Sequence, residues 1–300
     1  MNSTLITKYI DFVNEISKKH KYDSNIKHLL YLIIPAFISK YTLKNERLIL
    51  NTFNNTKIIT SNKNDKNIEA FYTSIPKYNN NKIETNKYIF IQNYENISLI
   101  QLLDNLVHEF NHAINSYNKE IQMQENILTL RTGLTKRIYS IPSLKPIEKE
   151  KTYILEEILN THQTETIINI IKNYQSPELD FINTTIYSIN NETNKNYTSK
   201  AYELENILFK KILENKTFIS TLNNLRLSGD INDIESWFDN ITNQKNSYQK
   251  LNTYLETNMK LQKKLINKKI FKKITIAKIK INISNTLDII RLFNKNCNYK

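Results

Sequence analysis

Two histidines four residues apart, with a glutamate after the first, carry the most chemistry in this sequence. The segment His108-Glu109-Phe110-Asn111-His112 reads HExxH. Residues four apart on a helix lie one turn apart on the same face, so both imidazoles can reach one metal ion. A tetrahedral Zn²⁺ is the usual partner of such a pair. Glu109 would project beside that ion, where a carboxylate can take a proton from a bound water.

The surroundings of the motif favour a buried helix. The chain has only five histidines. At that frequency, on the order of one such chain in a few hundred would contain HExxH by chance. The run from Leu99 to Val107 is apolar at helical spacing, and Ser98 is a candidate N-cap. The alternative is a buried helix with two hydrogen-bonded histidines and no metal. That alternative is disfavoured because it leaves several buried polar groups in need of partners.

A hydrolytic zinc site needs a third protein ligand and one open position. The metzincin arrangement is excluded, because Asn115 and Asn118 stand where its glycine and third histidine would be. The run from Tyr153 to Glu165 resembles the third-ligand helix of gluzincins, the thermolysin and aminopeptidase class. In that class an acidic residue inside an apolar helix, often preceded by Asn or Glu, completes the site. The resemblance covers about Leu99 to Glu165 and implies that Glu157 is the ligand.

The pattern favours Glu157 over Glu156. The residues that share a helical face with Glu157 are largely apolar, whereas those that share one with Glu156 are more polar. Two alternatives stay open: His162 as the third ligand, and Glu157 as an ordinary surface residue. By spacing, Glu165 or Thr161 could hold a ligand imidazole in the required tautomer.

The resemblance implies a zinc-dependent metallopeptidase, a hydrolase that acts on a peptide or protein substrate. Its Zn²⁺ cofactor would be held by His108, His112 and Glu157. Glu109 would be the catalytic residue, which accepts a proton from the zinc-bound water and passes it to the leaving nitrogen. The alternative function is that of a non-catalytic, zinc-stabilised zincin-like protein that acts as a binding module.

Such sites usually add a tyrosine or histidine that stabilises the oxyanion. With eighteen tyrosines in the chain, Tyr202 and Tyr197 are candidates on position only.

Composition bears on whether the protein binds nucleic acid, is held by disulfides or enters a membrane. The formal net charge is +13, but the chain is also rich in Asn, Ile and Tyr, as expected for an AT-rich genome. The charge is therefore weak evidence for a nucleic-acid partner, and we expect none. A single cysteine excludes an internal disulfide framework. The N-terminus lacks a signal-peptide pattern, and the most apolar run, 29–38, is too short for a bilayer. We therefore expect a cytoplasmic protein without stable membrane insertion.

The hydrophobic periodicity predicts an α+β, zincin-like fold that is predominantly helical. Early helices are expected at 4–19, 25–42 and about 44–53. Strands at 69–75 and 87–94, joined by a loop at 77–82, would form a small mixed or antiparallel sheet before the HExxH helix at 98–118.

Downstream, the pattern predicts a hairpin around Gly133 and then the Glu157 helix. The hairpin strands are expected at 127–131 and 135–141, and the helix at 147–173. The rest of the chain is expected to be mostly helical. We predict a catalytic region at 1–175 and a helical C-terminal region at 176–300 that packs on it.

The segment from Lys260 to Lys280 is strongly basic and has an apolar stripe at helical spacing. Its composition favours a packed C-terminal helix with a solvated lysine face. A surface for anionic lipid or nucleic acid is the alternative.

Overall fold

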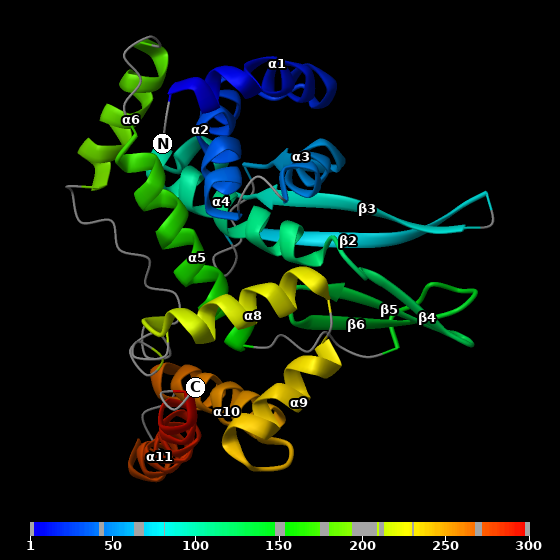
Figure 1. The fold of residues 1–300 in the computed structure, drawn as a ribbon, viewed down its shortest axis with the longest axis vertical. Coiled ribbons are helices and arrows are strands. Elements are labelled where there is room, and N and C mark those ends of the chain that lie inside the picture. The colour runs from blue at the N-terminus through cyan, green and yellow to red at the C-terminus, as the bar shows by residue number, and fades with distance from the viewer. Residues whose placement is uncertain are drawn as a thin grey trace.

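The computed structural model describes most of the chain. It covers residues 3–41, 45–62, 69–80, 82–147, 154–174, 180–193, 209, 213–229, 231–267 and 272–297. These residues contain ten α-helices and two three-stranded sheets (Figure 1). The predicted α+β class, with helices predominant, is confirmed.

Three helices open the chain. They are α1 (Ser3–His20), α2 (Ser24–Tyr41) and α3 (Glu46–Asn55), each within a few residues of its predicted range. Helix α2 is apolar on almost every face and is buried along most of its length. An all-round apolar helix must be enclosed by other elements. The helices α1, α3, α5 (Ile154–Lys172) and α6 (Asp180–Thr193) all pack against it.

The first sheet precedes the HExxH helix, as predicted. Its strands are β1 (Thr56–Thr60), β2 (Ala70–Asn79) and β3 (Lys82–Ile91), in the order β1-β3-β2. Strand β3 pairs in parallel with β1 and antiparallel with β2, so the sheet is mixed and β2 is an edge strand. The predicted loop at 77–82 is wrong, because the two strands continue almost to their turn. Strand β1 was not predicted, since a five-residue run directly after a helix carries little periodicity.

The HExxH helix is α4 (Leu99–Ser116), and its start follows the sequence signal closely. Ser98 is the N-cap, and its hydroxyl accepts a hydrogen bond from the backbone N–H of Gln101. The Gln101 side chain accepts in return from the Ser98 N–H, which completes a capping box. This cap fixes the register in which the helix presents its histidines.

Replacing Ser98 by alanine should lower the free energy of unfolding by about 1 kcal/mol, because one helix-terminal N–H loses its acceptor. Chemical denaturation measures the change. Ser98→Thr keeps the hydroxyl and is the matched control. Equal losses in the two variants would contradict a capping role.

The second sheet follows α4. Its strands are β4 (Ile121–Gln124), β5 (Ile127–Thr132) and β6 (Thr135–Ser140), all antiparallel. The predicted hairpin is confirmed, and Gly133 at its turn has φ +57°, which favours glycine. Strand β4 was not predicted.

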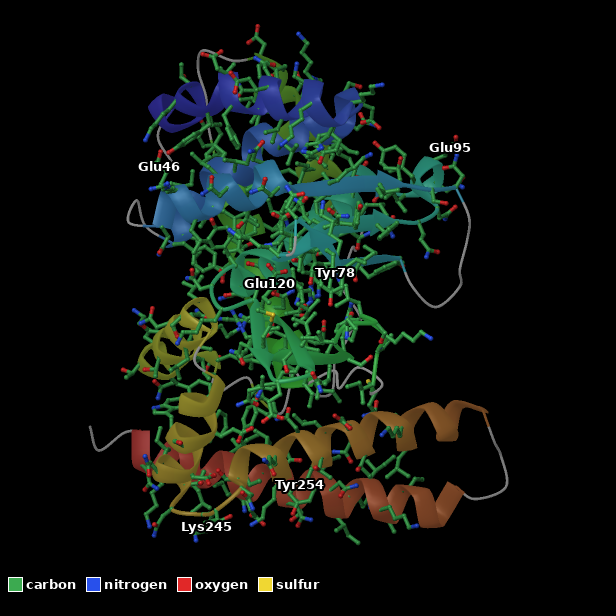
Figure 2. The ribbon with its side chains drawn as sticks, turned by 90° about the vertical axis from the view of Figure 1, so that its right-hand side faces the viewer. Glu46, Tyr78, Glu95, Glu120, Lys245 and Tyr254 are labelled. Carbon is green, nitrogen blue, oxygen red and sulfur yellow. The ribbon has the colours of Figure 1, made fainter. Side chains whose placement is uncertain are left out.

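Two polar contacts join the sheets. Lys87 Nζ lies 2.8 Å from Glu120 Oε2, and Arg137 Nη1 donates to Thr73 Oγ1 over 2.7 Å. Figure 2 shows Glu120 near the middle of the long axis, between the two sheets.

Helix α5 begins later than predicted. Ile147 lies in a bend, and residues 148–153 fall outside the described part of the chain. The C-terminal helices are α8 (Lys216–Ser228), α9 (Ile231–Thr242), α10 (Ser247–Asn267) and α11 (Lys272–Cys297). The single basic helix expected at 260–280 is wrong, because this segment comprises the end of α10 and the start of α11. Those two helices pack against each other at the end of the molecule opposite α1 (Figure 1).

Helix α5 contributes to two buried clusters. Its second half packs with the N-terminal helices, β-strands and α4, whereas its first half packs with the C-terminal helices. The boundary near residue 175 stays a prediction. None of the helices described is long and apolar enough to cross a membrane, and a cytoplasmic location stays a prediction.

Candidate metal centre

Helices α4 and α5 pack against each other and bring the three predicted ligands together. His108, His112 and Glu157 each offer one ligand atom, and these atoms all lie within 4.8 Å of one another. His108 Nε2 lies 3.2 Å from Glu157 Oε2. His112 Nε2 lies 3.5 Å from Glu157 Oε1. Both ring nitrogens that face the carboxylate are therefore the ε nitrogens.

These separations fit a zinc ion. With Zn–N and Zn–O bonds of roughly 2.0–2.1 Å, two ligands of a tetrahedral site lie about 3.4 Å apart. The two His–Glu distances, one to each oxygen of the Glu157 carboxylate, are close to that value. The donor set of two imidazoles and one carboxylate is also one that catalytic zinc sites use.

The second nitrogen of His112 gives an independent test of the fit. His112 Nδ1 is buried and has no hydrogen-bond partner, although Glu156 Oε1 lies 3.4 Å away. A metal on Nε2 places the ring proton on Nδ1, where it faces the Glu156 carboxylate. The structure therefore provides the ligand orientation and the supporting anion behind it.

Burial and mutual charge set the protonation of the three ligands. Burial alone would raise the pKa of Glu157, but His112 and His108 outweigh burial and lower it far below its usual value. Burial alone would lower the pKa of His112, but Glu157 and Glu156 raise it well above its usual value. The side chains thus form a cation–carboxylate cluster. A divalent cation at the cluster would replace the protons that neutralise it.

Glu109 lies on the same helix and is almost fully buried. Its Oε2 accepts a 2.6 Å hydrogen bond from the backbone N–H of Tyr72 on β2. Burial raises the pKa of Glu109, and His108 and His112 are close enough to lower it in part. One carboxylate oxygen is therefore held by the strand, and the raised pKa makes the group a stronger proton acceptor than an exposed glutamate.

Glu156 lies on the face of α5 that is more polar in the sequence, but the structure buries it. Its side chain is 0% exposed. Arg226 of α8 donates from Nε to Glu156 Oε2 over 2.9 Å and from Nη2 to Oε1. Glu156 Oε2 also accepts from the backbone N–H of Leu134 over 2.9 Å. Burial by itself would raise the pKa of Glu156, but Arg226 and His112 hold it at about 2.

Arg226 joins several residues on the polar face of α5. It also donates to Gln163 Oε1 over 2.8 Å and to Asn160 Oδ1 over 3.3 Å. Asn160 in turn donates to the backbone oxygen of His108 over 2.7 Å. The face of α5 that looked solvent-facing is therefore covered by α8. A side chain at Gly133 would collide with the Glu156 carboxylate, so this turn needs glycine for space as well as for its positive φ.

Arg226 was missed from the sequence, although one signal marks it. Phe218, Leu222 and Arg226 recur at four-residue spacing on the buried face of α8. An arginine on an apolar face needs a buried anion as its partner.

The other proposed site residues do not join the metal cluster. His162 is not one of its members, so the predicted three-histidine site is not supported. Thr161 donates its hydroxyl to the backbone oxygen of Glu157, and Glu165 is exposed and faces Asp104. Among the described residues, neither side chain forms a hydrogen bond or ion pair with His108 or His112. Tyr197 and Tyr202 lie outside the described residues.

The position of β2 bears on access to the site. Strand β2, at the edge of the first sheet, lies beside the HExxH helix. Its residues Tyr72, Thr73 and Ser74 are nevertheless buried, and Arg137 of the second sheet contacts Thr73. Solvent reaches the ligands at His108 and Glu157, whose side chains are 20% and 15% exposed.

No protein-family model matches the chain, and comparison with curated proteins and solved structures also gives no match.

Proposed function

We propose that this protein is a zinc-dependent metallopeptidase of the gluzincin type. One observation carries the proposal. Two imidazole ε nitrogens and the Glu157 carboxylate meet at zinc-ligand spacing, with a buried glutamate beside them on the HExxH helix.

The residues divide the work as follows. His108, His112 and Glu157 would hold the ion, and Glu109 would act as the general base. A bound Zn²⁺ supplies Lewis acidity towards a water molecule and a peptide carbonyl. Glu109 would accept a proton from the attacking water and donate it to the leaving nitrogen. Its hydrogen bond from the Tyr72 N–H keeps the carboxylate oriented without occupying its second oxygen.

Zinc is the metal that this donor set favours. Imidazole nitrogens combined with a single carboxylate suit zinc better than magnesium or calcium, which prefer sites made of oxygen ligands. The side chains of the three ligands are only 10–20% exposed, so the ion would lie in surroundings less polar than water. Low polarity strengthens the interaction between the ion and developing charge.

Removal and return of the metal test the proposal. After dialysis against a chelator, the protein should take up about one Zn²⁺ per chain by elemental analysis. Hydrolysis of a quenched fluorescent peptide library should disappear on chelation and return with zinc. Absence of tight zinc binding would contradict the metal site itself.

The second candidate function is a zinc-stabilised binding module without catalysis. The buried stretch of β2 beside Glu109 favours it, because Tyr72, Thr73 and Ser74 leave little exposed strand with which a peptide substrate could pair. The same experiment separates the two functions. A chain that binds one zinc and gains thermal stability but cleaves no library peptide is the binding module.

A further inference from the structure

A cavity of about 690 Å³ lies between the C-terminal end of α2, helix α5 and helix α8. Its lining includes none of the three metal ligands, so it is separate from the metal centre. Among the described residues, three basic side chains line it, namely the half-buried Lys40 and His162 and the exposed Lys216, and no acidic side chain does. Four asparagines supply most of its other polar groups, and Ile219 and Leu227 add apolar surface.

The charge on the cavity wall is uncompensated. Lys40 is half-buried, and within the described part of the chain its ammonium group makes no hydrogen bond or ion pair. Burial lowers the pKa of Lys40. Burial and the nearby Lys40 also lower the pKa of His162, which leaves that imidazole neutral near pH 7. A partly desolvated cation without a counter-charge is unfavourable, and an anion that enters the cavity relieves that cost.

The wall is held in place by hydrogen bonds before any ligand arrives. Tyr41 donates its hydroxyl to Gln163 Oε1 over 3.1 Å, and Gln163 donates to Asn223 Oδ1 over 2.5 Å. Asn118 donates to the backbone oxygen of Leu227 over 2.7 Å. These contacts tie α2, α5, α8 and the turn after α4 together around the opening. A preformed cavity of this kind is what small-molecule sites usually require.

We propose that this cavity binds a small organic phosphate. Lys40 and Lys216 would pair with the phosphate oxygens as point charges. Lys216 also lies in the first turn of α8, where the helix dipole favours negative charge. The asparagine amides would donate to the remaining oxygens, and Ile219 and Leu227 would contact the organic part. The volume lies within the range of about 300–1,000 Å³ typical of such sites.

Titration calorimetry of the full chain with phenyl phosphate, at about 150 mM salt, tests this proposal. We expect saturable binding of one molecule per chain, tighter than that of inorganic phosphate, because only the organic ligand reaches the apolar wall. Lys40→Gln and Lys216→Gln should each weaken binding about tenfold. Lys18→Gln on α1 makes the same charge change on an exposed surface and should leave the affinity unchanged.

Asn224→Asp keeps the shape of an exposed lining residue and adds a like charge, so it should also weaken binding. This variant decides the question if Lys40→Gln fails to fold. Two results would overturn the proposal. One is the absence of saturable binding to the folded parent protein. The other is an equal loss of affinity in Lys18→Gln, which would make the interaction one of net charge alone. Both results are independent of zinc binding and peptide hydrolysis.

Discussion

Replacing Glu109 by glutamine should leave zinc bound and reduce peptide hydrolysis by about 10²–10⁴-fold. The amide oxygen of glutamine can still accept the hydrogen bond from the Tyr72 N–H, so the local structure should persist. The amide cannot take up a proton from water, so the chemical step loses its base. Steady-state kinetics and elemental analysis of the same sample measure the two effects.

Glu165→Gln is the matched control for this change. Glu165 lies on α5 but is exposed and outside the metal cluster. Its replacement should alter neither the zinc content nor kcat/KM. If Glu109→Gln retains kcat/KM within about twofold, the glutamate is not the general base and the hydrolytic mechanism is wrong.

Breaking the Glu156–Arg226 pair should produce the largest loss of stability. Both side chains are 0% exposed, and removal of either one leaves the other as an unpaired buried charge. We expect Glu156→Gln and Arg226→Met each to lower the free energy of unfolding by about 3–5 kcal/mol.

A double-mutant cycle shows whether the pair is the cause. The Glu156→Gln, Arg226→Met double variant should be much less destabilised than the two single losses combined, because no unpaired charge remains. Glu46→Gln, which breaks a surface pair with Lys8, is the control and should have a far smaller effect. Additive losses in the cycle would show that the two residues act independently.

The sequence alone determined the parts of this protein that depend on local periodicity. The HExxH helix and its cap at Ser98 follow from spacing within one helix. The hairpin at Gly133 follows from a turn residue between two apolar runs. In each case the deciding residues lie within about two turns or one hairpin of each other, so the pattern is visible in a short window.

The tertiary structure alone decided how the polar face of α5 is used. Glu156 and Arg226 are 70 residues apart in the chain, and the sequence around each residue does not indicate that the other is its partner. A polar helical face looks the same in sequence whether water or a second helix covers it. Here α8 covers it, so Glu156 on that polar face is the buried anion behind His112.

The short strands show the same limit. Strands β1 and β4 have five and four residues, too few to establish an alternation of their own. Their backbone groups become strands only because β3 and β5 supply hydrogen-bond partners. Periodicity predicts which face of an element is buried, but the identity of the covering element depends on the packing of the whole chain. Burial of polar backbone groups and charged side chains is favourable only when they gain hydrogen-bond or ion-pair partners. In this protein those partners come from distant parts of the sequence.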